Sequence, residues 1–277
     1  MTPPARGGAS RHGRPVRRTS TGSFALAGLG VVGELLVTAG VLLLAFLVWQ
    51  LWWTDVEGNR AQAEIVRNLD WAQAPTAAPS AAPTPGATGT GATGTGATPG
   101  PVIAAPRRGE EPPVAAEPDL RTTFATLQVP RWDGEPERPV SEGVDKATVL
   151  DALGIGHYPG TAMPGAIGNF AMAGHRTTYA KPFNRVAELQ VGDSIVIRTA
   201  STWYVYRVTS TEIVTPHDVE VIAPVPGKPG VRPTERSITL TTCHPIFSAR
   251  ERFIVHGVLD YWAPVSSGVP AEIAGGA

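Results

Sequence analysis

The longest run of apolar residues predicts a helix that crosses a membrane. Residues 24–53 are apolar apart from three polar positions, Glu34, Thr38 and Gln50. Residues 35–53 alone reach the roughly 20 residues that a helix needs to span a bilayer. Three tryptophans close the run, where such rings favour the membrane–water interface: Trp49, Trp52 and Trp53.

A basic segment precedes this run and predicts its orientation. The first 18 residues carry five arginines and no acidic residue. Because arginine-rich flanks stay in the cytoplasm, residues 1–23 are a cytoplasmic tail and the bulk of the chain lies outside the cell membrane. A cleaved signal peptide is the alternative, with a small-x-small site at residues 61–63. That site lies ten residues beyond Trp53, so an uncleaved, single-pass signal anchor over residues 24–53 fits better.

Residues 54–119 are predicted to be a juxtamembrane segment and a linker. From about residue 72 to 118 the composition collapses to Ala, Pro, Thr and Gly, and the pentad GATGT occurs at 86–90 and again at 91–95. Such a segment buries too little apolar surface to offset the entropy of ordering it. We therefore expect a disordered tether, followed by a folded domain.

Residues 120–265 are predicted to form an all-β domain of the barrel or sandwich type. Short runs rich in Val, Ile, Thr and aromatic residues are separated by Pro and Gly, as expected for strands. These runs are TTFATLQVP, DSIVIRT, TWYVYRVTS, SITLTTC and RFIVHGVLDYW, and GNFAMAGHR has the same character. Short helices are expected at 146–153 and 183–189. Residues 266–277 are predicted to be a flexible tail.

Composition and charge exclude several classes of protein. The 277 residues include one cysteine, so an internal disulfide or a multi-thiolate zinc site is impossible. The formal net charge is −1, and the chain beyond the basic tail holds 18 basic and 24 acidic residues. A nucleic-acid binder normally shows a strong basic excess. We expect no nucleic-acid partner.

The lone cysteine, Cys243, is a candidate nucleophile. It ends the strand-like run 237–243 and precedes a loop, which is where a barrel exposes side chains; the alternative is a small buried hydrophobic residue. A cysteine nucleophile needs an acid–base partner and a group that stabilises an oxyanion. Five histidines of the extracytoplasmic part are candidate partners, and the residues alone do not choose among them: His157, His175, His217, His244 and His256.

Arg252 is the candidate cation. It begins the strand-like run 252–262, nine residues after Cys243. Two strands joined by the short loop 244–251 would pair antiparallel and bring Arg252 back beside Cys243. Its guanidinium stays charged and donates several hydrogen bonds, which suits an oxyanion or a substrate carbonyl. An ordinary surface arginine is the alternative.

Several strings together resemble the sortase family. Residues 239–243, TLTTC, are similar to its TLxTC signature, and His175, Cys243 and Arg252 follow the order of its catalytic triad. The wider strings HYPGTAMPGAIGNFAMAGHR and TLTTCHPIFSARERFIVHG look most like class E sortases of high-GC Gram-positive bacteria. The resemblance implies an eight-stranded sortase-type β-barrel with short helices, and it covers residues 120–262.

The resemblance also implies a reaction. A sortase cleaves a sorting signal of a surface protein between Thr and Gly, holds the acyl group on Cys243 as a thioester, and passes it to an amine of a peptidoglycan precursor. His175 would act as acid and base, and Arg252 would bind the oxyanion. Tyr158 resembles a residue implicated in choosing Leu-Ala-x-Thr-Gly over Leu-Pro-x-Thr-Gly, and Thr242 matches a position that contacts substrate. We expect no cofactor and no metal.

Other readings stay open. One is a non-enzymatic tethered β-domain that binds cell-wall polymer or protein partners, with Cys243 as packing. Another is a pilin-polymerising sortase, which would typically show a lid or a further membrane segment. A zinc site formed by Cys243, His244 and His256 lacks a recognised spacing. The signatures of papain-like proteases and L,D-transpeptidases do not occur around Cys243.

Overall fold

The computed structural model describes residues 21–72 and 101–275. The chain forms two compact units, residues 1–50 and residues 51–277. The predicted basic tail falls largely within residues 1–20, and the GATGT repeats fall within residues 73–100. Both of these features lie outside the described residues.

The N-terminal helix, α1, is Thr21–Asn68. From Leu29 onward it is long and apolar enough to cross a membrane. The large apolar side chains of residues 29–49, and those of Trp52 and Trp53, are exposed all round the helix, as expected for a segment whose solvent is lipid. The helix continues past Trp53 through part of the predicted juxtamembrane segment, and its last turns, residues 51–68, belong to the second unit.

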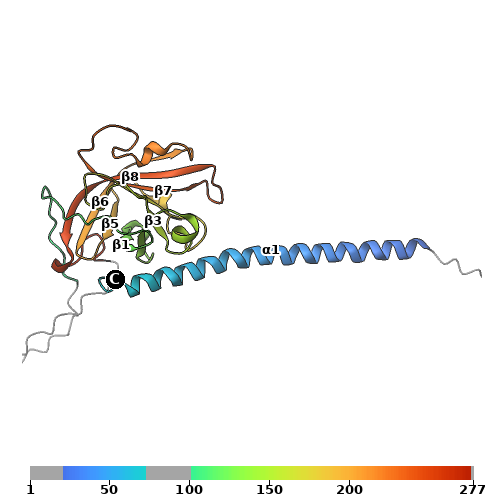
Figure 1. Cartoon of the computed structure of the whole chain (residues 1–277). Helices are drawn as coiled ribbons and strands as arrows, with labels where there is room; N and C mark the ends of the chain where they lie inside the picture. Colours follow the sequence, from blue (N-terminus) through green and yellow to red (C-terminus); the bar gives the residue numbers. More distant parts are fainter. Residues whose placement is uncertain (1–20, 73–100, 276–277) are drawn as a thin grey trace, which may run out of the picture. The chain divides into compact units, whose positions relative to one another are not determined.

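The second unit is built on a closed eight-stranded barrel (Figure 1). Around the barrel the strands follow the order β1-β2-β3-β4-β7-β8-β6-β5. Neighbours pair antiparallel except β2 with β3 and β4 with β7, which pair parallel. The bounds are β1 Thr123–Gln128, β2 Arg138–Glu142, β3 Ile155–His157, β4 Gly168–Ala173, β5 Ser194–Arg198, β6 Thr202–Val214, β7 Arg236–His244 and β8 Glu251–Pro264. The expected eight-stranded all-β barrel is confirmed.

In the described residues, four short helical turns lie between strands and a fifth follows β8. They are η1 Pro130–Trp132, η2 Lys146–Leu150, η3 Val186–Glu188, η4 Val219–Ile222 and η5 Val265–Ser267. The helices expected at 146–153 and 183–189 are therefore each present only in part. Two strands, β2 and β3, do not stand out in the sequence, because β2 contains Pro139 and β3 has only three residues.

The barrel interior is a single apolar core. Strand β7 illustrates the pattern, since Ile238 and Leu240 are fully buried in the core and alternate with Thr239 and Thr241. Burying each such side chain contributes roughly 1.5–3 kcal/mol. The core side chains that are less than 2% exposed include Leu127, Ile155, Phe170, Met172, Ile195, Tyr206 and Ile238.

Segments on either side of the barrel strands pack against β6 and β8. The backbone nitrogen of Arg107 donates to the Trp262 carbonyl at 2.8 Å, and Ile103 forms an isolated parallel β-bridge with Val269. The indole of Trp203 donates to the Gly268 carbonyl at 3.1 Å. These contacts hold residues on both sides of 120–265 against the barrel, including part of the predicted tail.

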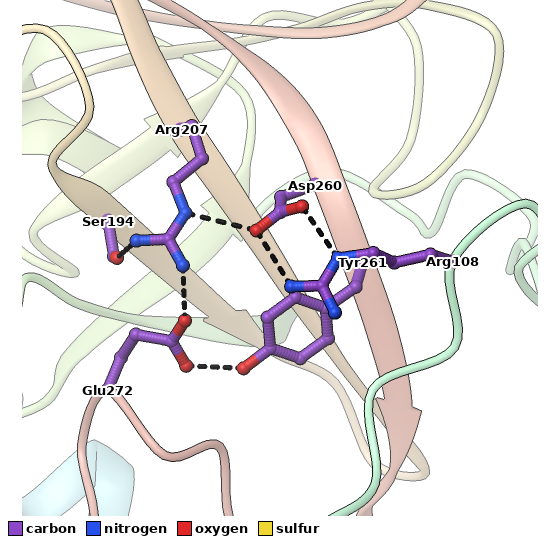
Figure 2. A network of polar contacts seen from close by, with 6 residues as sticks. All are labelled: Arg108, Ser194, Arg207, Asp260, Tyr261 and Glu272. Carbon is purple, nitrogen blue, oxygen red and sulfur yellow. Dashed lines mark hydrogen bonds and ion pairs between the residues drawn. The ribbon is translucent and has the colours of Figure 1, made fainter.

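A polar network ties these segments to the barrel wall (Figure 2). Asp260 of β8 accepts two hydrogen bonds from Arg108, at 3.0 and 3.2 Å, and one from Arg207 of β6 at 3.1 Å. Glu272 accepts from Arg207 and from the Tyr261 hydroxyl. The bond from Arg108, and then that from Arg207, lower the pKa of Asp260.

We predict that Asp260→Asn lowers the free energy of unfolding by about 1–2 kcal/mol near neutral pH, because three charge-assisted hydrogen bonds weaken. The pKa of Asp260 is lower in the folded state, so its contribution is present above the unfolded pKa of roughly 3.9. It is lost as pH falls through the folded value. Urea unfolding of wild type and variant at pH 7 and at low pH measures this. An equal difference in unfolding free energy between wild type and variant at both pH values would show that the charge of Asp260 does not contribute to stability.

Candidate active site

The end of β7 brings Cys243 between two neighbouring strands. In the antiparallel pair of β7 and β8, Cys243 lies opposite Arg252. On the other side β7 runs parallel to β4, and Thr241 lies opposite Ala173. Cys243 is a free, half-buried thiol. The ends of β4, β7 and β8 therefore meet at one rim of the barrel.

Two hydrogen bonds fix the backbone that leads to His175. The Gly174 nitrogen donates to the Thr241 carbonyl at 3.2 Å. The Thr242 hydroxyl donates to the Gly174 carbonyl at 2.7 Å. These bonds continue the β4–β7 ladder by one residue, so that His175 follows on the strand next to the end that carries Cys243. The structure thus brings His175, Cys243 and Arg252 onto three adjacent strand ends.

The His175 imidazole is oriented by two side chains. Its Nε2 lies 2.6 Å from Asp151 Oδ1, and since an ionised carboxylate only accepts, the ring nitrogen donates. Its ring packs on Tyr179 with 5.2 Å between centroids. Lys146 binds the other Asp151 oxygen at 2.7 Å and lies over the Tyr179 ring, and the bond with Asp151 raises the pKa of Lys146. These contacts limit the orientations open to the imidazole.

Arg252 is half-buried and holds its guanidinium close to the chain. It donates to the carbonyls of Ala249 and Glu251 at 2.9 and 3.0 Å. It also lines a pocket of about 100 Å³ together with Tyr158, Thr241, Ile254 and residues 214–216, 218, 219, 221 and 222. A fixed cation at the edge of a pocket is suited to binding a carbonyl or an oxyanion.

The pocket contains one of the two predicted substrate-binding residues. The Tyr158 hydroxyl lies 3.0 Å from the Thr241 hydroxyl on the pocket wall. Thr242 is 3% exposed and points its hydroxyl at Gly174 instead. In this structure the threonine that reaches the pocket is therefore Thr241.

A second arginine, Arg176, lies behind Cys243 and was not foreseen from the sequence. It is 5% exposed, and its Nη1 donates to the Cys243 carbonyl at 3.2 Å and to His244 Nδ1 at 2.8 Å. Because arginine has no acceptor, His244 Nδ1 accepts this bond. Burial lowers the pKa of Arg176, and the nearby Cys243 opposes the shift. The only sequence signal for Arg176 is its position directly after His175.

Apart from His244, which accepts from Arg176, the other candidate histidines are His157 in β3, His256 within β8 and His217 in the loop after β6. His157 is fully buried, with Nδ1 2.6 Å from Glu142, and burial raises the pKa of that carboxyl. His256 contacts Thr239 and Glu212 at 2.9 and 3.0 Å. His217 is exposed in a loop. Within residues 21–72 and 101–275, no three His, Cys, Asp or Glu side chains are grouped so that they could hold a metal.

Comparison with known proteins identifies the family. The sortase domain family matches residues 127–260. Sortase SrtE2 of Streptomyces coelicolor is 32% identical over 260 residues, covering 87% of this chain and 86% of that protein. The chain therefore belongs to the sortase family, whose members are cysteine transpeptidases.

Similarity is also high to other sortases. Sortase SrtE1 of S. coelicolor is 34% identical over 265 residues, covering 93% of this chain and 64% of SrtE1. Its crystal structure with a tripeptide in the active site matches 55% of this chain and 96% of that chain, at 39% identity and a TM-score of 0.51. The structure of SrtA of Actinomyces oris matches 60% of this chain and 94% of that chain, at 45% identity and a TM-score of 0.57. The similarity to SrtE1 and SrtE2 agrees with the class E resemblance of the sequence.

We predict that iodoacetamide alkylates Cys243 in the folded chain, because the thiol is half-buried at a strand end rather than packed in the core. Intact-mass spectrometry measures the labelling without ambiguity, since the chain has one cysteine. Cys243→Ala is the control and should take up no label. Labelling that appears only after denaturation would point to a packing role for the thiol.

Proposed function

We propose that this chain is a membrane-anchored sortase that transfers a surface protein onto a cell-wall amine. The substrate is a sorting signal of the Leu-Ala-x-Thr-Gly or Leu-Pro-x-Thr-Gly type, cleaved between Thr and Gly. One observation carries the proposal: Cys243 and Arg252 lie opposite each other on β7 and β8, and His175 follows the adjoining end of β4, in a chain of the sortase family.

In the first half of the proposed reaction the Cys243 thiolate attacks the carbonyl carbon of the substrate Thr. A C–S bond forms, and the carbonyl oxygen becomes an oxyanion that Arg252 stabilises. The C–N bond to Gly then breaks. His175 gives a proton to the departing amine, and the acyl group remains on Cys243 as a thioester.

In the second half an amine of a peptidoglycan precursor attacks the thioester. A C–N bond forms, the C–S bond breaks, and His175 takes the proton that the amine loses. Cys243 returns to the thiolate, so the cycle uses only side chains of the enzyme and needs no cofactor or metal.

Two further residues have proposed roles. Tyr158 lines the pocket beside Arg252, which suits a part in choosing between Leu-Ala and Leu-Pro signals. Thr242 donates its hydroxyl to Gly174, and we assign it the task of fixing the backbone before His175.

The proposed location is the cell membrane. Helix α1 would span it once with the arginine-rich N-terminus in the cytoplasm and the barrel outside. In that arrangement the catalytic domain meets both the surface proteins and the wall precursors.

We predict that His175→Gln lowers kcat for cleavage by about 10²–10⁴-fold, the usual contribution of general acid–base catalysis. The assay uses the full chain in detergent micelles with Leu-Ala-x-Thr-Gly and Leu-Pro-x-Thr-Gly peptides and an amine, followed by mass spectrometry. Cys243→Ala should form no product. His217→Gln, at the exposed loop histidine, is the matched control and should stay within about twofold of wild type. Equal loss in both histidine variants would remove His175 from its proposed role.

We predict that Tyr158→Phe changes the ratio of kcat/KM for Leu-Ala and Leu-Pro peptides by about threefold to tenfold, the effect of removing one hydrogen bond. The lost hydroxyl is the group that contacts Thr241 in the pocket. Measurement of both peptides under identical conditions gives the ratio directly. An unchanged ratio would show that Tyr158 does not govern this choice.

A further inference from the structure

The end of α1, residues 55–68, and the residues that follow it up to Ala72 are anchored to the barrel by hydrogen bonds from buried arginines. Arg138, the first residue of β2, is 5% exposed and donates to Asn59 at 2.7 Å and to Gln62 at 3.1 Å, in addition to its ion pair with Glu135 at 2.8 Å. Arg198 of β5 is 7% exposed and donates to the carbonyls of Trp71 and Ala72. A buried cation without acceptors is strongly destabilising. Residues 59–72 therefore supply several of the acceptors that these two buried arginines need, and they pack as part of the folded domain.

The end of α1 also contacts the loop that follows His175. The Gln62 amide donates to the Tyr179 carbonyl at 3.2 Å, and Lys181 binds Asp55 at 2.6 Å. The helix comes so near that a Cβ on Gly58 would lie 2.7 Å from the Ala180 nitrogen. Only glycine allows this approach.

That loop has a backbone that needs outside support. Tyr179, Ala180 and Lys181 have φ angles of 53°, 64° and 40°. Non-glycine residues in this left-handed region are strained, and they persist when surrounding contacts hold them. The contacts of the preceding paragraph, all from α1, act on these three residues.

The helix also contacts the second segment that orients His175. Gln62 is 1% exposed and packs against Gly154, where a Cβ would lie 2.8 Å from Gln62 Cδ. Gly154 has a φ of 108° and ends the turn that begins with Asp151. One side chain of α1 thus contacts both the turn with Asp151 and the loop with Tyr179.

We propose that the end of α1, through Gln62, is a positioning element of the active site that holds Asp151 and Tyr179 in place around His175. Asp151 is the hydrogen-bond partner of the imidazole, and the Tyr179 ring packs against the imidazole ring. When Gln62 is removed, both segments loosen and the ring samples orientations that do not serve proton transfer. The inference rests on the proposed function for its catalytic part only.

The test compares three variants of the full chain in detergent micelles. Gln62→Ala removes every contact of the amide. Gln62→Glu keeps an acceptor for Arg138 and the side-chain volume beside Gly154, but it cannot donate to the Tyr179 carbonyl. Glu64→Gln lies on the exposed side of the same helix and is the control.

Hydrogen exchange reports on positioning without reference to activity. In Gln62→Ala, the amides of Leu153, Gly154, Lys181 and Phe183, which are hydrogen-bonded in the wild type, should exchange faster, whereas those of β8 residues 254–258 should not change. In Gln62→Glu, only the amides of Lys181 and Phe183 should exchange faster than in the wild type. Glu64→Gln should match wild type. Unchanged exchange at all four amides in Gln62→Ala would overturn the proposal.

Kinetics test the catalytic part. Gln62→Ala should lower kcat about tenfold with KM nearly unchanged, because misplaced catalytic groups slow chemistry more than binding. Faster exchange with an unchanged kcat would overturn the positioning role while leaving the sortase assignment intact. A wild-type chain that cleaves neither peptide would instead overturn the proposed function, and the catalytic part of this inference with it.

Discussion

The register of β7 between β4 and β8 is the constraint on which the site depends. A shift of one residue would turn every side chain of β7 to the other face and separate Cys243 from Arg252. A buried polar cluster further along the strand fixes this register, since the Thr239 hydroxyl lies 2.8 Å from Asn169 of β4 and 2.9 Å from His256 of β8. Polar groups without solvent must find their partners. The same three strands therefore carry both the polar cluster that fixes the alignment and the residues that the alignment brings together.

Buried arginines fix the positions of loops, as this polar cluster fixes the register of the strands. Arg176, Arg138 and Arg198 are each less than 10% exposed, and each takes acceptors from a segment distant in sequence. Arg176 ties the residue after His175 to the end of β7. Because a buried guanidinium needs acceptors in fixed directions, it specifies the position of a backbone more sharply than apolar contact does.

The sequence predicts those parts of the fold that have strong local patterns. The apolar run indicates α1, and the β-branched runs indicate β1 and β4 to β8. The number of strands came from the family resemblance, since Pro139 conceals β2 and three residues are too few to reveal β3. The pairing of Cys243 with Arg252 follows from a short hairpin loop. His175 is different, because a parallel β4–β7 pair that no local pattern encodes places it beside the end of β7. Asp151 comes from yet another turn.

Gly58 shows how a local sequence rule yields to packing. Glycine in a helix interior costs about 1 kcal/mol relative to alanine, and residues after Trp53 are more polar than the apolar run before them. The helix nevertheless continues to Asn68, because the barrel supplies Arg138, Lys181 and the Tyr179 carbonyl as partners for its polar side chains. The residue that weakens the helix locally is the one that lets it approach Ala180. Such conflicts between local preference and packing are expected close to functional sites, and this one lies beside the loop that supports His175.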